Sequence, residues 1–135
     1  MTTQNISAST QMPLLTFNSL YGILREEKTS RTLQQLPELF YEGVKSFLQK
    51  KKEEIRKLKE EKNQDRLSKE MRVYKNSKKI IEELVTLRLI KISAIGVRAS
   101  FYGDENALSK NILEKENSFL VDVEKSSKLI KEVLV

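Results

Sequence analysis

The feature that most constrains the fold of this chain is a long apolar repeat near its middle. Seam positions recur every three or four residues, and seven of the nine are apolar, a pattern typical of a coiled-coil-like helix. From Ile80 a second apolar stripe appears, comprising Ile80, Leu84, Leu87 and Ile90. We therefore expect one helix over about 65–100, buried inside a bundle over 80–99. The seam residues are Leu67, Met71, Tyr74, Lys78, Ile81, Val85, Arg88, Ile92 and Ile95.

Shorter amphipathic patterns before this repeat predict two further helices. Apolar residues spaced three and four apart predict a first helix over 14–28. A second helix is expected to begin near Pro37, because proline suits the first helical position and Glu38 and Glu42 suit the positive end of the helix dipole. Its apolar stripe consists of Phe40, Val44, Phe47, Leu48, Ile55 and Leu58.

The polar stretch 59–65 predicts a turn around Asn63, which would pair the second helix with the long one. At 1.5 Å per residue the long helix would span roughly 50 Å, more than a compact domain of this size needs. Residues 50–75 are therefore predicted to form a thin helical hairpin that projects from the bundle.

The ends of the chain carry weaker patterns. Residues 1–13 have no charged side chain, and we expect a flexible tail followed by a helical domain over 14–116. Gly103 is expected to end the long helix, and Asp104 to cap a further one with a modest apolar face. The remainder, 117–135, alternates like a strand and then repeats like a helix, so a short helix, a strand and a tail all stay open. The apolar face of the helix expected after Asp104 consists of Ala107, Leu108, Ile112 and Leu113.

The composition argues against catalysis. The chain has no His and no Cys, which removes the commonest general base near neutral pH, the commonest metal ligand and the thiolate nucleophile. Its four glycines are scattered, so there is no glycine-rich phosphate loop. Its paired acids are adjacent, and neighbouring helical residues point in different directions rather than converging. We expect no enzymatic activity, metal or cofactor and, since no run of 18 apolar residues occurs, a cytoplasmic protein.

The net charge of +6 is concentrated between Lys45 and Lys91, where 16 basic residues face 8 acidic ones. One interpretation is a DNA-facing arm whose lysines neutralise phosphates. The other is a pair of solvated helices, kept soluble by Glu and Lys four residues apart. Interleaved acids and few stacking aromatics favour the second interpretation. The candidate DNA contacts are Lys50, Lys51, Lys52, Lys78 and Lys79.

Arg88 lies on the seam that is expected to be buried. A buried charge has to be paired, and Glu82, Glu83 or an acid of a partner chain would serve. A pair inside the monomer and a pair at a subunit interface both remain open.

Several motifs occur in an order that resembles a GINS complex subunit. They are LREEK at 24–28, LQQLPELFY at 33–41, YKN at 74–76 and EELVTLRLIKI at 82–92. The resemblance covers about residues 14–115. It is greatest to the archaeal type related to the eukaryotic Sld-five and Psf-one subunits.

The resemblance implies an all-helical A domain without catalytic activity. Such subunits form a tetramer that binds the MCM replicative helicase and a RecJ-like partner, whose place Cdc-forty-five takes in eukaryotes. The usual β-rich B domain would need more than the roughly twenty residues after 115. The apolar 80–99 helix and C-terminal segment independently indicate an obligate partner. Core and subunit contacts are expected from Leu20, Leu24, Phe40, Tyr41, Leu84, Leu87, Arg88 and Ile92.

The sequence thus predicts a non-catalytic scaffold that works with a second GINS subunit at replication forks. The alternative is a small basic helical protein that binds DNA.

Overall fold

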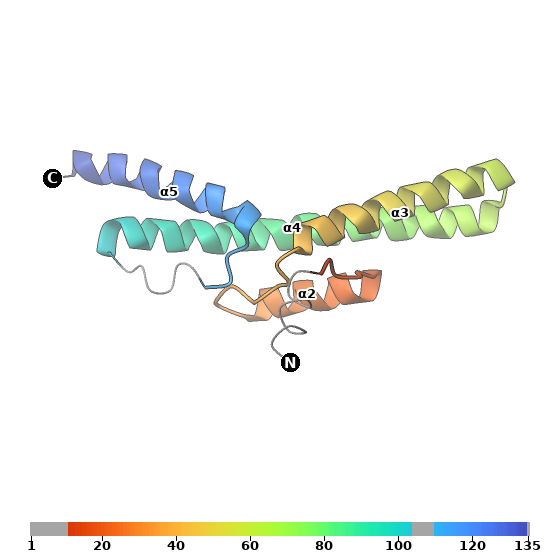
Figure 1. Ribbon diagram of the computed structural model, residues 1–135, viewed down its shortest axis with the longest axis horizontal. Coiled ribbons are helices and arrows are strands. Elements are labelled where there is room, and N and C mark those ends of the chain that lie inside the picture. The colour runs from red at the N-terminus through yellow and green to blue at the C-terminus, as the bar shows by residue number, and fades with distance from the viewer. Residues whose placement is uncertain (1–10, 104–109, 135) are drawn as a thin grey trace. The chain divides into compact units, whose positions relative to one another are not determined.

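The structure of the protein, a computed structural model, describes residues 11–103 and 110–134. Within these ranges every regular element is a helix, so the predicted all-α class is confirmed. The predicted N-cap Asp104 and the apolar Ala107 and Leu108 lie outside the described residues. The helices of these ranges, labelled in Figure 1, are α2 (Phe17–Thr29), α3 (Phe40–Glu61), α4 (Gln64–Tyr102) and α5 (Glu114–Val133).

The chain divides into two compact units. The first comprises Met1–Arg25 and Pro37–Leu84, and the second comprises Glu26–Leu36 and Val85–Val135. Two helices, α2 and α4, therefore contribute residues to both units.

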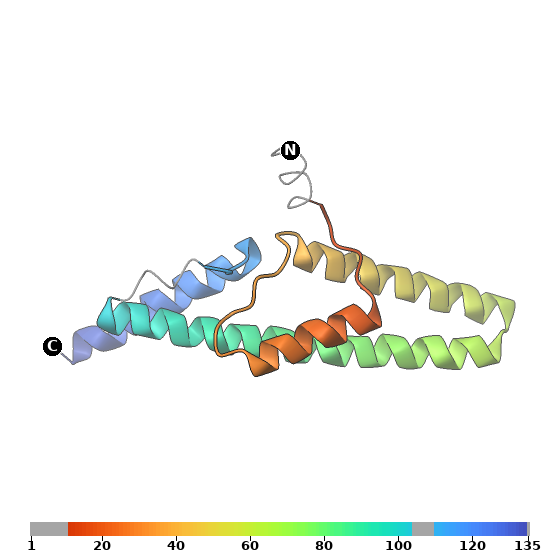
Figure 2. The ribbon, with the colours of Figure 1, turned by 90° about the horizontal axis from the view of Figure 1, so that it is seen from below.

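In the first unit, α3 and the first half of α4 run side by side in opposite directions (Figure 2). The chain reverses at Lys62, which has a left-handed backbone with φ 57°. The N–H of Asn63 then donates to the carbonyl of Leu58, which satisfies one of the last carbonyls of α3. Across the pair, Lys51 Nζ lies 3.2 Å from Glu70 Oε2. The turn predicted around Asn63 is thus confirmed. That the hairpin 50–75 projects from a bundle stays a prediction.

The start of α3 differs from the prediction. The helix begins at Phe40, and the carbonyl of Pro37 accepts a hydrogen bond from the Phe40 N–H at 3.0 Å. Pro37 therefore belongs to the turn before the helix, where its fixed φ serves equally well. Just inside the helix, Gly43 lies against Pro13, whose Cγ would be 2.8 Å from a Cβ at Gly43.

The buried face of α4 in the first unit departs from the predicted seam at two positions, Met71 and Lys78. Lys78 is exposed, and its neighbour Ser77 is fully buried. The small serine fits a tightly packed site, whereas the Lys78 ammonium stays in water, 5.8 Å from the centroid of the Tyr74 ring. Ser77 Oγ has no hydrogen-bond partner among the described residues. The buried apolar residues of this unit are Leu20, Leu24, Phe40, Val44, Phe47, Leu58, Ile81 and Leu84.

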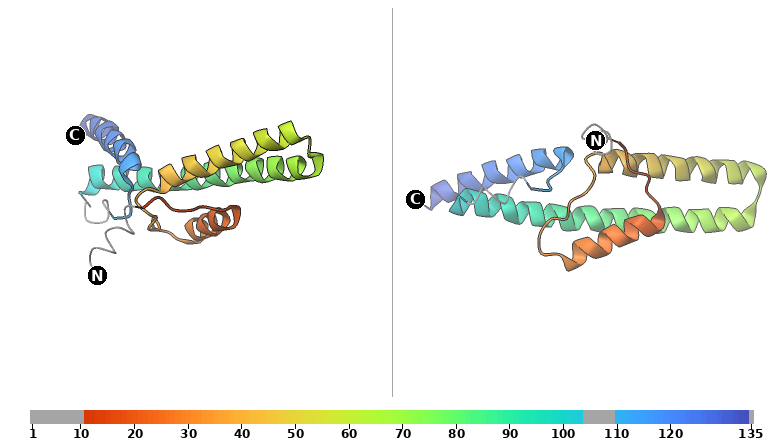
Figure 3. Two further views of the ribbon diagram at one scale, coloured as in Figure 1. Left: turned by 45° about the vertical axis from the view of Figure 1, so that its right-hand side comes forward. Right: turned by 60° about the horizontal axis from the view of Figure 1, so that its bottom comes forward.

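In the second unit, α5 lies beside the second half of α4 and runs in the same direction (Figure 3). A Cβ on Gly96 would come within 2.8 Å of Val123 Cγ1, so the two helices approach closely there. One turn further on, Ser100 Oγ donates to the Glu124 carbonyl at 3.1 Å. The core of this unit consists of Leu33, Ile92, Ala99 and Leu120, with Leu89, Ile95, Ile112 and Phe119 packed against it.

The segment 117–135 is neither a strand nor a short helix where it is described. It belongs to one helix of 20 residues that continues to Val133. Phe119 and Val123 are four residues apart and partly buried, whereas Val121 between them is exposed, as expected for a helix with one buried face.

Candidate functional site

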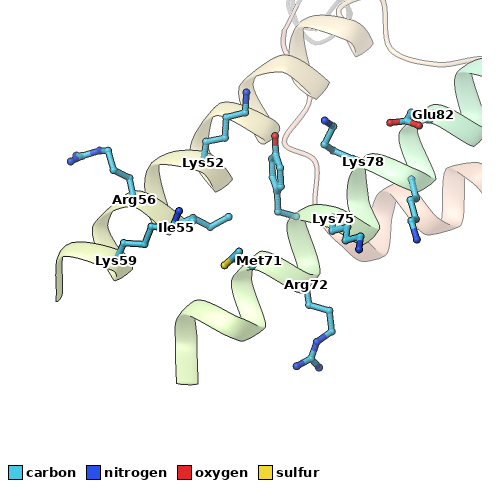
Figure 4. A pocket seen from close by; sticks show the side chains of 11 residues that line it. Lys52, Ile55, Arg56, Lys59, Met71, Arg72, Lys75, Lys78 and Glu82 are labelled. Carbon is cyan, nitrogen blue, oxygen red and sulfur yellow. The ribbon is translucent and has the colours of Figure 1, made fainter. Parts of the chain in front are cut away.

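A groove of about 940 Å³ lies between α3 and α4 in the first unit. Its floor is apolar and consists of Ile55 from α3 and of Met71 and Tyr74 from α4. Ile55 and Met71 point into the space between the two helices (Figure 4). Because Met71 is 47% exposed, the predicted apolar seam is open to solvent at this level rather than closed.

The rim of the groove is strongly basic, with seven cationic side chains and one acid, Glu82. Arg56 is neutralised locally, since it bonds Glu53 and Glu60 of its own helix, and this lowers the pKa of Glu53. The other six cations make no ion pair with any described residue: Lys52, Lys59, Arg72, Lys75, Lys78 and Lys79.

The groove gathers three of the five lysines that were predicted to touch nucleic acid. Lys52, Lys78 and Lys79 line it. Lys50 is exposed but does not line it, and Lys51 is engaged by Glu70 and lies 5.9 Å from the centroid of the Phe47 ring. The remaining rim cations were not among the predicted contacts: Arg56, Lys59, Arg72 and Lys75. Steps of three and four residues from Lys52 and from Lys79 would have found them.

A second polar cluster surrounds Arg88 in the second unit, where its side chain is fully buried. All five N–H donors of the guanidinium are used. Nε and Nη2 donate to the two carboxylate oxygens of Glu116 at 2.7 and 2.9 Å. Nη1 donates to Glu27 Oε1 at 2.9 Å and to the Gln34 carbonyl at 3.0 Å, and Nη2 also donates to the Asn111 carbonyl at 2.9 Å.

Glu27 is the second centre of this cluster. Lys91 Nζ donates to its carboxylate at 2.6 Å and to its carbonyl at 2.7 Å, and Gln34 Nε2 donates to Oε1 at 3.0 Å. Burial raises the pKa of Glu27, but the hydrogen bonds from Lys91, Gln34 and Arg88 outweigh it and leave the pKa below 4.5. Burial likewise opposes the charge of Arg88, and its bonds to Glu116 and Glu27 still raise its pKa.

The predicted partners of Arg88 are therefore wrong. The observed carboxylates belong to Glu27 and Glu116, 61 and 28 residues away in the chain, rather than to Glu82 or Glu83. The pair lies inside the chain, so of the two alternatives the intramolecular one holds. With two cations and two anions the cluster is electrically balanced, as buried charges require.

The last turns of α5 turn their polar side toward α4. Ser127 is buried, and Lys131 Nζ donates to the carbonyls of Ser100 and Phe101 at 3.0 and 3.2 Å. Four apolar side chains at this end of α5 are exposed by 61–83%. These residues, here called the α5 apolar face, are Leu129, Ile130, Val133 and Leu134.

The residues predicted to form the core and the subunit contacts are mostly buried within the chain. Tyr41 and Leu87 are only partly buried. The fully or nearly fully buried ones are Leu20, Leu24, Phe40, Leu84, Arg88 and Ile92.

Across residues 11–103 and 110–134, no group of three His, Cys, Asp or Glu side chains could hold a metal ion. None of the helices in these ranges combines the length and apolarity that crossing a membrane requires. No protein-family model, curated protein or solved structure matches the chain.

Proposed function

We infer that the protein is a non-catalytic scaffold subunit that docks onto another helical subunit through the α5 apolar face. The exposure of this face is the observation that carries the proposal. Leu129 and Val133 are 65% and 83% exposed, while the polar Ser127 and Lys131 of the same helix face α4. A contiguous apolar patch on a helix is typical of a surface that another apolar surface covers.

The proposed assembly is of the GINS type. Three of the four motifs that carry this resemblance meet in one cluster: Glu27 from LREEK, Gln34 from LQQLPELFY, and Arg88 and Lys91 from EELVTLRLIKI. These three motifs thus have a shared structural purpose, which is to hold the segment before α3 against α4. This supports the resemblance, because residues so far apart in the sequence serve one packing arrangement.

In this proposal the subunit pairs with a second GINS subunit and links the MCM helicase to a RecJ-like or Cdc-forty-five-like protein. It acts in the cytoplasm, at replication forks on the nucleoid. A structural role suits Arg88, Glu27 and Glu116, because every donor of the buried guanidinium is already occupied. No strong donor of this group is left for a substrate.

Co-expression with a candidate GINS partner subunit tests this proposal. The chain alone is expected to be poorly behaved, and the co-expressed pair to form a compact tetramer by light scattering. A pulldown of native partners from the source cells should recover replication proteins. The proposal would be contradicted if the chain is a stable monomer by light scattering and does not bind the partner subunit.

The DNA-binding alternative stays a prediction. It requires affinity for DNA that falls steeply with salt and is lost when Lys50, Lys51, Lys52, Lys78 and Lys79 are neutralised.

A further inference from the structure

The groove between α3 and α4 combines two properties that a solvated helix pair does not need. It has an apolar floor, and it has a rim of seven cations against one acid. We propose that this groove binds an acidic amphipathic helix of a partner protein, with apolar side chains on the floor and carboxylates on the rim. It belongs to the first unit and the α5 apolar face to the second, so this inference goes beyond the proposed function and does not depend on it.

The floor offers apolar surface that the chain itself leaves uncovered. Met71 is 47% exposed, and Ile55 and Tyr74 are partly buried. Methionine is flexible and polarisable, which lets such a surface adapt to the side chains that dock on it. About 940 Å³ is enough for several apolar side chains, as helix-in-groove recognition requires.

The rim specifies the charge of the occupant. Two cations of the helix pair have acids beside them: Lys51, outside the groove, has Glu70, and Arg56, on the rim, has Glu53. Along the groove, Lys52, Lys75 and Lys79 have no ion-pair partner among the described residues. Like charges gathered along one groove repel each other, and an acidic occupant relieves that repulsion.

The same geometry favours a peptide over a nucleic acid. Binding to phosphates needs cations but gains nothing from Ile55 and Met71. Base stacking needs an open aromatic face, and Tyr74, the only aromatic of the groove, has Lys78 Nζ 5.8 Å from its ring centroid. An amphipathic acidic helix uses both the floor and the rim.

The absence of Trp from the chain makes a direct test simple. Tyr74→Trp places a single indole in the floor of the groove. The probe is a Trp-free synthetic helix of about 18 residues with Leu on one face and Glu on the other. Titration should shift the indole emission to shorter wavelength and saturate. A peptide of scrambled order, and a Tyr102→Trp reporter in the second unit, should give no shift.

Matched charge reversals test the rim. Lys52→Glu with Lys75→Glu should weaken binding about tenfold. Lys50→Glu with Lys69→Glu places the same charges on exposed sites of the same two helices outside the groove and should leave affinity unchanged. Met71→Ser, which removes floor surface without changing charge, should also weaken binding, with helicity by circular dichroism unchanged.

Three results would overturn the inference. The first is no emission shift with the acidic helix. The second is equal binding of the scrambled peptide, or equal loss in both double variants, which would reveal non-specific charge attraction. The third is a DNA oligonucleotide that binds the groove more tightly than the peptide, which would assign it to nucleic acid.

Discussion

At the scale of single residues, Arg88 decides how the second unit holds together. Its guanidinium joins segments near Glu27, Gln34, Asn111 and Glu116, and no single one of them could be inferred as its partner from spacing. Glu116 also accepts a hydrogen bond from the Leu113 N–H at 3.0 Å and so satisfies a donor at the start of α5. One arginine therefore fixes both a connector and a helix start.

Arg88→Met is expected to destabilise the protein by about 3–5 kcal/mol, because Glu27 and Glu116 would stay buried with one cation fewer. The free energy of unfolding, from urea titration followed by circular dichroism, measures the loss. Arg98→Met is the control, since Arg98 is exposed on the same helix and should change stability by less than about 0.5 kcal/mol. Equal effects of the two changes would contradict the structural role of the cluster.

The lowered pKa of Glu27 predicts that the protein loses stability in acid. Its pKa is lowered in the folded chain, so below the ordinary value of 4.5 the unfolded chain binds more protons than the folded one. The free energy of unfolding should therefore decrease as the pH falls from 4.5 toward the folded pKa. Glu27→Gln should be less stable at neutral pH and show a flatter decline in acid. A variant with an unchanged acid slope would show that another group causes the decline.

At the scale of elements, the sequence pattern predicts the helices well and their edges less well. The long helix was expected over 65–100 and is observed over Gln64–Tyr102, because its repeat is long and uninterrupted. The start of α3 was predicted near Pro37 and is observed at Phe40, and of the alternatives left open for 117–135 a helix is observed, longer than the short one considered. Proline suits a turn as well as a first helical position. Apolar residues at alternate positions occur both in strands and in helices with two partly apolar faces.

Glycine substitutions test the contact between α4 and α5. Gly96→Ala should destabilise the protein by about 1–3 kcal/mol, because its Cβ would lie 2.8 Å from Val123 Cγ1 and 3.2 Å from Leu120 Cδ1. Gly22→Ala meets nothing within 4 Å and should stabilise α2 by about 0.5–1 kcal/mol. The midpoint temperatures of thermal unfolding of the two variants measure these changes in stability. Stabilisation by Gly96→Ala would mean that the helices are less close than described.

At the scale of the whole molecule, apolar surface remains after each unit has formed its core. The α5 apolar face illustrates this, because its side chains are 61–83% exposed while Lys131 of the same turns donates to the Ser100 carbonyl of α4. Ile90, the last residue of the second stripe on α4, was expected to be buried and is 61% exposed. That expectation is wrong for Ile90, whereas Leu84 of the same stripe is fully buried.

Leu129→Glu with Ile130→Glu is expected to weaken binding of the partner subunit at least about tenfold. The same pair should leave the chain's own stability nearly unchanged, because both side chains are more than half exposed. Lys125→Glu with Lys128→Glu is the control, since it adds acids to exposed positions of α5 without removing apolar surface. Light scattering of co-expressed complexes is the measurement, and a complex that survives the first pair would place the interface elsewhere.

By itself the sequence determined the all-helical class, the long central helix, the turn near Asn63 and the need to pair Arg88, because periodicity, capping and desolvation are local properties. Only the tertiary structure decided which acids pair with Arg88, that Ser77 rather than Lys78 is buried, and that Lys52 and Lys75 share one groove. These depend on how helices are rotated and which distant segments meet. Small differences in packing decide them, and spacing along one helix does not contain that information.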